Sequence, residues 1–154
     1  ALMVRTSAFF GPWDNYNFVT LALSALTKGQ RFAVSTDITV SPTYVPDLVH
    51  ASLDLLIDRA AGIWHLANAH ALTWLELAVM AAEKAGVDNS GLDARASQEF
   101  GYAAVRPAYS ALSSERGIIL PALDDALDRY LATRRHEMPV EPPEKMTGTR
   151  KIRD

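Results

Sequence analysis

Short strand-like runs alternate with stretches of helical periodicity along this chain, and no other feature limits its fold as much. The strand-like runs cover residues 2–6, 31–35 and 62–68. Each is followed by a stretch with apolar residues at helical spacing, the pattern of a helix with a buried face. Strands that alternate with helices form parallel sheets covered by those helices. The sequence therefore predicts an α/β fold with a few mostly parallel strands.

Start and stop signals delimit the predicted helices. Gly29 ends the first helix as a C-terminal cap, and Pro46 lies in the first turn of the second, where a missing N–H costs nothing. Thr73 and Glu76 form a capping box, in which two residues satisfy each other's free N–H groups at a helix start. The predicted helices cover residues 15–29, 45–59, 73–86 and 121–135.

Two of these helices have a clear division between faces. The polar face of the second predicted helix carries Asp47, His50, Asp54 and Asp58. The apolar stripe of the last one carries Leu123, Leu127, Tyr130 and Leu131. We expect the stripe to be buried and the polar face to be solvated.

The predicted sheet is incomplete. Parallel strands are normally paired on both sides and covered on both faces. Here three strands make one small sheet, and the first begins at residue 2, so we expect the strands beside it to be encoded upstream. An open edge along residues 2–6 would expose backbone donors and acceptors, which predicts self-association into a homo-oligomer.

The length of 154 residues fits one domain followed by a tail. Residues 136–154 hold three of the eight prolines and no periodic apolar pattern, which predicts a mobile tail. The formal net charge of −3 argues against a nucleic-acid partner. The division is therefore a folded lobe, residues 1–135, and a tail, residues 136–154.

Cysteine usage and hydropathy bear on the compartment. The chain has no cysteine, which excludes disulfides and thiolate chemistry and is compatible with a reducing cytoplasm. No apolar run approaches the roughly 20 residues needed to span a bilayer. The opening residues become polar too soon for a signal peptide. We expect a soluble, cytoplasmic protein without a membrane partner.

Common catalytic signatures do not occur. His65 and His70 are five residues apart, which is not a same-face spacing, so a structural His65 is preferred over a metal site. There is no G-x-S-x-G elbow. No two glycines are closer than five positions, which excludes a G-x-G or P-loop phosphate cradle. The adjacent Asp124 and Asp125 point in different directions on a helix and are expected to be solvated.

Three loop regions are not explained by packing alone: residues 5–18, 36–44 and 102–110. Arg106 stands out because guanidinium groups in aromatic loops suit bidentate recognition of phosphate. The alternative is a surface arginine beside an acidic residue.

The same loops carry a resemblance. The stretches "VRTSAFFGPWDNYNFV", "SPTYVPDLVHASLDLL", "GIWHLANAHALTWLELA" and "VRPAYSAL" resemble, in order and spacing, the C-terminal portion of dTDP-4-dehydrorhamnose reductases. These enzymes are extended short-chain dehydrogenase/reductases. The resemblance covers residues 2 to about 133 and implies the C-terminal, substrate-binding part of a Rossmann-type reductase.

In such a reductase a hydride passes from NAD(P)H to the 4-keto group of a nucleotide sugar. The resemblance implies an upstream Rossmann domain with a Gly-rich turn and a Tyr-x-x-x-Lys pair, and neither motif occurs in this sequence. We therefore expect no catalytic residue and no cofactor held by this chain alone, with NAD(P)H bound by the parent and a nucleotide sugar as substrate. The alternative is a non-catalytic interaction or regulatory module derived from the same family.

Individual site residues follow from the resemblance. Thr6 and Ser7 would lie near the nicotinamide of the cofactor. The implied substrate contacts are Ala8, Phe10, Asn17, Phe18, Thr43 and Arg106. Three positions depart from the family pattern: Ala8 replaces a tryptophan, Phe10 a common tyrosine, and Val105 the first arginine of an Arg-Arg-Pro motif. Without that aromatic ring and that charge, the exact sugar stays open.

Overall fold

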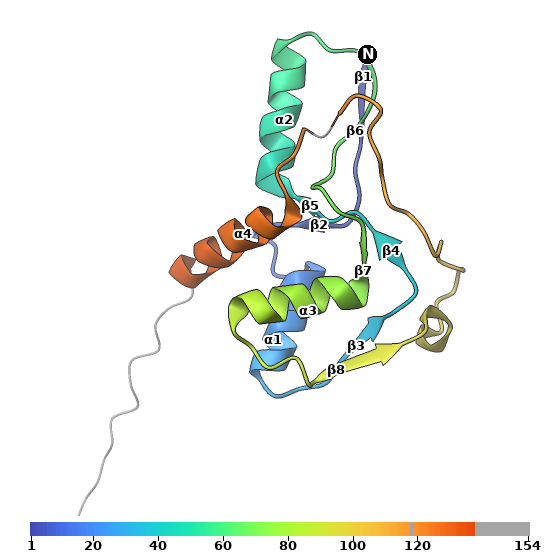
Figure 1. Cartoon of the computed structure of the whole chain (residues 1–154), viewed down its shortest axis with the longest axis vertical. Coiled ribbons are helices and arrows are strands. Elements are labelled where there is room, and N and C mark those ends of the chain that lie inside the picture. The colour runs from blue at the N-terminus through green and yellow to red at the C-terminus, as the bar shows by residue number, and fades with distance from the viewer. Residues whose placement is uncertain (118, 138–154) are drawn as a thin grey trace, which may run out of the picture.

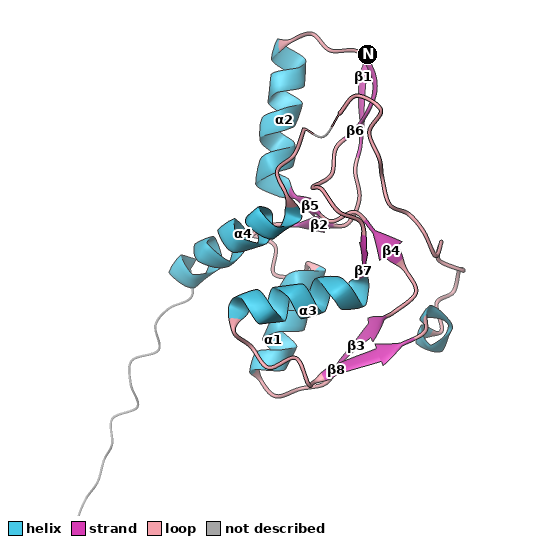
Figure 2. Ribbon diagram, in the orientation of Figure 1, coloured by secondary structure: helices cyan, strands magenta, loops and turns pink. Residues whose placement is uncertain are grey.

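The structure is a computed structural model that describes residues 1–117 and 119–137. Its helices are α1 (Phe18–Thr27), α2 (Val45–Ile57), α3 (Trp74–Ala85) and α4 (Leu123–Glu137), with a short 3₁₀ helix at Ser97–Phe100. The strands are β1 (Leu2–Arg5), β2 (Phe9–Phe10), β3 (Phe32–Ser35), β4 (Thr39–Val40), β5 (Thr43–Tyr44), β6 (Gly62–His65), β7 (Leu72–Thr73) and β8 (Leu92–Arg95). Figures 1 and 2 show their arrangement.

The strands form four separate pairs. β1 pairs in parallel with β6, β3 with β8 and β2 with β5, whereas β4 and β7 are antiparallel. The α/β class with mostly parallel strands is confirmed. The expectation of one sheet containing all three predicted strands is wrong, because β3 pairs with β8, in a segment outside the predicted strands. The sequence of β8, "LDAR", has only alternating weak apolar residues, so its pairing depends on tertiary contacts.

Two apolar clusters hold these elements. In the upper part of Figure 1, α2 covers the β1–β6 pair, and Ala51 and Leu55 of α2 pack with Leu66 and Leu120. In the larger cluster the predicted stripe of α4 is fully or almost fully buried against α3 and β5. Burial of one stripe of each helix follows from the spacing of its apolar residues.

The helix ends match their sequence signals closely. Thr73 Oγ1 accepts a hydrogen bond from the Glu76 amide at 3.2 Å, and Glu76 Oε2 accepts one from the Thr73 amide at 2.7 Å. Gly86 ends α3 in the left-handed conformation, with φ of 68°. These contacts confirm the capping box and the predicted end of α3. The last helix extends to Glu137, two residues into the predicted tail, and the rest of that tail lies outside the described residues.

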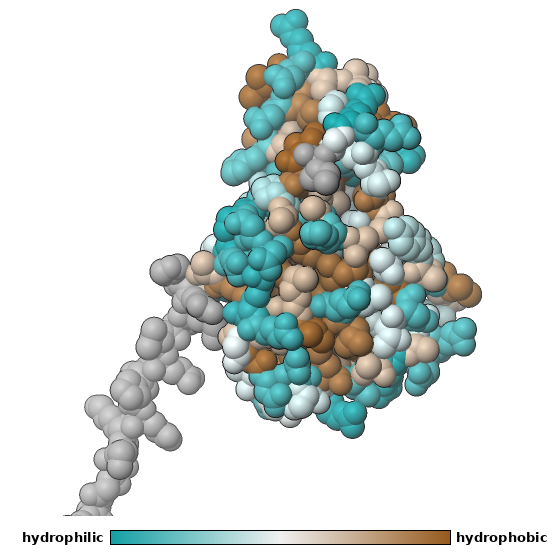
Figure 3. All heavy atoms as spheres, in the orientation of Figure 1, coloured by the Kyte–Doolittle hydropathy of each residue, from teal (hydrophilic) through white to brown (hydrophobic). Residues whose placement is uncertain are grey.

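Apolar side chains also reach the surface. Val49, Leu53, Leu56 and Ile57 of α2 are 47%, 51%, 59% and 77% exposed. Brown apolar surface is visible over this helix in Figure 3. None of the helices in residues 1–117 and 119–137 has both the length and the apolarity to cross a membrane.

Candidate functional site

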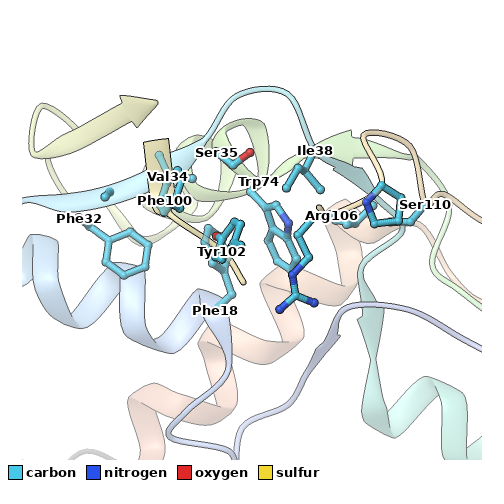
Figure 4. Close-up of a pocket in the computed structure, with 13 residues that line it drawn as sticks. Phe18, Phe32, Val34, Ser35, Ile38, Trp74, Phe100, Tyr102, Arg106 and Ser110 are labelled. Atoms are coloured by element: carbon cyan, nitrogen blue, oxygen red, sulfur yellow. The ribbon is translucent and has the colours of Figure 1, made fainter. Parts of the chain in front are cut away.

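A cavity of about 430 Å³ lies beside β3. Most of the aromatic side chains that contact another aromatic ring line this cavity. One part of its lining comes from β3 and from the first residues of α1 and α3. The other part comes from the segment between the 3₁₀ helix and Ser110. Figure 4 shows the lining, which consists of Phe18, Phe32, Ala33, Val34, Ser35, Ile38, Val40, Trp74, Phe100, Tyr102, Arg106, Pro107 and Ser110.

Helix starts place the first group of rings. Asn17 caps α1 and Thr73 caps α3, so Phe18 and Trp74 are the first residues of their helices. Their ring centroids are 4.6 Å apart, and the Phe32 ring from β3 lies 5.6 Å from that of Phe18. Tilted and edge-on pairs at these distances are favourable beyond the area they bury. The three rings form a continuous apolar wall.

The facing wall is built around a left-handed glycine. Gly101 has φ of 60°, which a residue with a Cβ adopts only at a cost. The rings on either side of it, Phe100 and Tyr102, stack with centroids 5.5 Å apart and planes within 6°. The Arg106 guanidinium carbon lies 5.4 Å from the centre of the Tyr102 ring, within cation–π distance.

Arg106 is the one charged side chain among the residues that line this cavity. Arg106 is exposed, and no ion pair to it occurs within the described parts of the chain, so the acidic partner of the alternative is not found there. The hydroxyls of Ser35 and Ser110 donate to Asp37 and to the Thr39 carbonyl oxygen. Flat rings with a single unpaired cation suit a ligand that joins an aromatic group to an anion.

Backbone groups of β3 also face this cavity. The amides of Phe32 and Thr36 donate to Gly91 and Arg95 beside them, each at 3.0 Å. Alternate residues of a strand bond to the same neighbour, so the N–H and C=O of Ala33 face away from β8. No second strand pairs with β3 within the described residues. Ala33, which lines the cavity, therefore has one backbone donor and one acceptor that are not bonded to β8.

The predicted residues divide between two places. Phe18 and Arg106 line the cavity, whereas Thr6, Ser7, Ala8 and Thr43 lie near the carboxyl end of β1. There Thr6 Oγ1 donates to Thr43 Oγ1 at 3.1 Å, and the Thr43 amide donates to the Ala8 carbonyl oxygen at 3.0 Å. Ser7 lies between Thr6 and Ala8 in the same turn. The structure thus brings the first and second motif stretches together, and Ser41 of the second stretch is hydrogen-bonded to Leu112 of the stretch that contains Arg106.

Phe10 and Asn17 have contacts typical of structural residues. Phe10 is 2% exposed, and its ring lies 5.2 Å from that of Tyr44 and 5.6 Å from that of Tyr130. The two hydrogens of the Asn17 amide nitrogen are shared among Gly11 O, Asp14 O and Thr20 Oγ1, and its oxygen accepts from the Thr20 amide. These bonds use the hydrogen-bonding capacity of the side chain, so we infer that Asn17 positions Phe18 by capping α1.

A buried ion pair joins α2 to α4, and sequence reasoning did not find it. Asp47 was expected on a solvated face but is 7% exposed. Its oxygens accept from Arg129 Nη1 and Nη2 at 2.6 and 2.8 Å, and from Asn68 Nδ2 at 2.9 Å. Desolvation raises the pKa of Asp47, but these hydrogen bonds outweigh it and the pKa lies below its usual value. Periodicity could not reveal this ion pair, because Arg129 lies 82 residues from Asp47 in the sequence.

Comparison with known proteins places this fold. The family model described as the RmlD substrate binding domain matches residues 1–134. The chain belongs to this family. Among curated relatives, the spore coat polysaccharide biosynthesis protein SpsK of Bacillus subtilis is 34% identical over 136 residues, which are 86% of this chain and 47% of SpsK.

This member of the RmlD family is also similar to dTDP-4-dehydrorhamnose reductases. A dTDP-4-dehydrorhamnose reductase of Mycobacterium tuberculosis is 32% identical over 117 residues, 75% of this chain and 38% of that protein. The solved structure of dTDP-4-dehydrorhamnose reductase from Bacillus anthracis, in complex with NADP, superimposes with a TM-score of 0.78 at 29% identity, over 85% of this chain and 48% of that one. The chain therefore spans half or less of the length of these relatives.

The residues present do not make a dinucleotide site by themselves. Thr6 and Ser7 follow the carboxyl end of β1, where ligands bind in open parallel sheets. However, the Thr6 hydroxyl is bonded to Thr43, and no closely spaced glycines follow a strand to hold a pyrophosphate. At most these two residues would form one wall of a cofactor site whose remaining contacts come from elsewhere.

Proposed function

We propose that this chain is the nucleotide-sugar-binding lobe of a dTDP-4-dehydrorhamnose reductase-like, NAD(P)H-dependent enzyme. The observation that carries this is Arg106 held over Tyr102 in an aromatic cavity without a carboxylate in its lining. Membership of the RmlD substrate binding domain family supports the same reading. In this proposal the lobe of residues 1–135 binds the substrate.

The nucleotide part of the substrate fits this cavity by its chemistry. A pyrimidine base would stack on the ring wall of Phe18 and Trp74, and its imide edge matches the backbone donor and acceptor of Ala33. The Arg106 guanidinium would bind the diphosphate through two parallel hydrogen bonds. A cavity of about 430 Å³ is in the range of small-molecule sites. The sugar would then extend toward the turn that contains Ala8 and toward Thr43 of β5.

Hydride transfer needs groups that this sequence lacks. The chain has neither a Gly-rich fingerprint nor a Tyr-x-x-x-Lys pair, so we propose that an upstream Rossmann domain of the parent supplies NAD(P)H and the proton donor. We expect no NADPH oxidation when a dTDP-4-keto sugar is added to these 154 residues alone. Detectable turnover by the purified chain would refute this part of the proposal.

Thermal unfolding with nucleotides tests the binding proposal. A ligand at 100 times its dissociation constant adds about 2.7 kcal/mol of stability, or roughly 5–10 °C for a domain of this size. We expect thymidine diphosphate to raise Tm in the wild type and to have a much smaller effect in Arg106→Ala. The matched control is Arg31→Ala, because Arg31 is an exposed arginine outside the cavity.

A chain that binds no nucleotide would support the alternative, an interaction module of the same family. The exposed apolar residues of α2 favour that alternative, because contiguous apolar surface often marks a protein interface. In that case neither thymidine diphosphate nor a dTDP-sugar would change Tm.

A further inference from the structure

We infer that Asp37 is a positioning residue of this cavity, acting through the segment that presents Arg106. That segment, residues 97–106, is called the aromatic arm below. The inference rests on the proposed function, since it concerns how the same cavity is made ready for its nucleotide.

Asp37 attaches the start of the aromatic arm to the end of β3. Its Oδ1 accepts hydrogen bonds from the Ser97 amide at 2.8 Å and from the Ser35 hydroxyl at 2.9 Å. Its Oδ2 accepts one from the Ser97 hydroxyl at 2.9 Å. Desolvation raises the pKa of Asp37, but the bonds from Ser97 and Ser35 outweigh it and hold that pKa below its usual value. Asp37 is therefore a carboxylate at neutral pH and accepts all three bonds.

The chain just beyond the arm is attached to the same short stretch. The Thr39 amide donates to the Ala108 carbonyl oxygen at 2.8 Å, and the Ser110 amide donates to the Thr39 carbonyl oxygen at 2.9 Å. Both ends of the arm are thus fixed within three residues of each other, at Asp37 and Thr39. The arm leaves from the first attachment and returns to the second, so its path along the cavity depends on both.

Between these attachments the arm has few contacts with the core. Tyr102 is 45% exposed and Val105 is fully exposed, and no residue of the 3₁₀ helix is buried. The internal contacts of the arm are the Phe100–Tyr102 stack and the Arg106 contact to Tyr102. Such a segment opens easily when an attachment is lost. Loss of Asp37 would leave the stack and Arg106 free to take several positions, and the ligand would have to order them on binding.

The test is a double-mutant cycle on the binding of thymidine diphosphate, measured by calorimetry on the full chain. We expect Asp37→Ala to weaken binding by about tenfold, because hydrogen bonds to a charged group are lost. Asp37→Asn should recover part of the affinity, since an amide oxygen still accepts from Ser97. Asp88→Ala is the matched control, because Asp88 accepts from the amide and hydroxyl of Ser90 in the same way, outside the cavity.

The cycle separates positioning from a general structural role. If Asp37 acts through Arg106, Asp37→Ala has little further effect in the Arg106→Ala background. An equal loss in both backgrounds, or no loss in either, would overturn the inference.

Hydrogen exchange of the free protein tests, without any ligand, whether Asp37 holds the aromatic arm in place. We expect Asp37→Ala to speed exchange of amides in residues 97–106 and to leave α3 unchanged. If the wild type binds no nucleotide, the proposed function fails, and faster exchange in the arm still supports its attachment by Asp37. Unchanged exchange in the arm would refute that attachment.

Discussion

Removing the carboxylate of Asp47 should destabilise the protein more than any exposed charge change. Asp47 is buried and receives two hydrogen bonds from Arg129, at 2.6 and 2.8 Å, and one from Asn68. Arg129 also lies over the Tyr44 ring at 5.0 Å, next to Thr43. The variant Asp47→Ala therefore leaves three N–H groups, two of Arg129 and one of Asn68, without their acceptor and loosens the contact between α2 and α4.

The size of the effect follows from burial. Breaking a fully buried ion pair by removing one partner costs about 3–5 kcal/mol. The Arg129 side chain is 39% exposed, so water can replace part of what it loses. We therefore expect Asp47→Ala to lower the free energy of unfolding by about 2–3 kcal/mol, or roughly 4–12 °C in Tm. Asp125→Ala is the matched control, because Asp125 accepts from the same guanidinium but is 61% exposed, and its loss should cost under about 0.5 kcal/mol.

The pH dependence gives an independent check. The pKa of Asp47 is lowered in the fold from its usual value of 3.8, so its stabilisation is present above that value. It is lost as the pH falls through the lower, folded pKa. Urea unfolding should show the gap between wild type and Asp47→Asn at pH 7 and a smaller gap below about pH 3.8. A gap that stays constant with pH, or a loss at pH 7 no larger than that of Asp125→Ala, would refute the reasoning.

Three further predictions have defined outcomes. Thr73→Ala removes one half of the capping box of α3 and should lower the free energy of unfolding by about 1 kcal/mol in urea. An unchanged free energy of unfolding would show that the cap does not stabilise the protein. Ala8→Gly should raise stability by about 1 kcal/mol because Ala8 has φ of 46°, while the control Ala61→Gly, outside any helix, should not stabilise. The open edge of β1 predicts self-association at high concentration by sedimentation, and a clean monomer there would contradict it.

Local signals were sufficient for the helices. Each helix has its apolar stripe within its own sequence, and α3 also has its caps there, at Thr73, Glu76 and Gly86. These contacts join residues a few positions apart, so they can be read from spacing. The two-residue strands have no such signal. β2 and β5 are strands because Phe9 and Phe10 pair with Thr43 and Tyr44, more than 30 residues along the chain.

The cavity was only partly predictable for the same reason. Arg106 was singled out by its proline and its aromatic surroundings, and the structure places it over Tyr102. Trp74 lies within the predicted helix of residues 73–86, and it lines the cavity because it is the first residue of α3. Phe100 gave no signal, since its position depends on Gly101 and on the attachment of Ser97 to Asp37.

Motif residues shared with a family do not reveal by themselves which of them touch a ligand. In the first motif stretch, Phe10 is packed between two tyrosines, and the Asn17 side chain is hydrogen-bonded to the start of α1. Asn17 is needed for Phe18 to lie at the cavity, because the cap on α1 sets where the helix and its first side chain begin. A substitution at Asn17 would therefore weaken ligand binding through Phe18 even without a contact to the ligand. Affinity loss at such a position has to be compared with the loss of helix stability before it is assigned to the site.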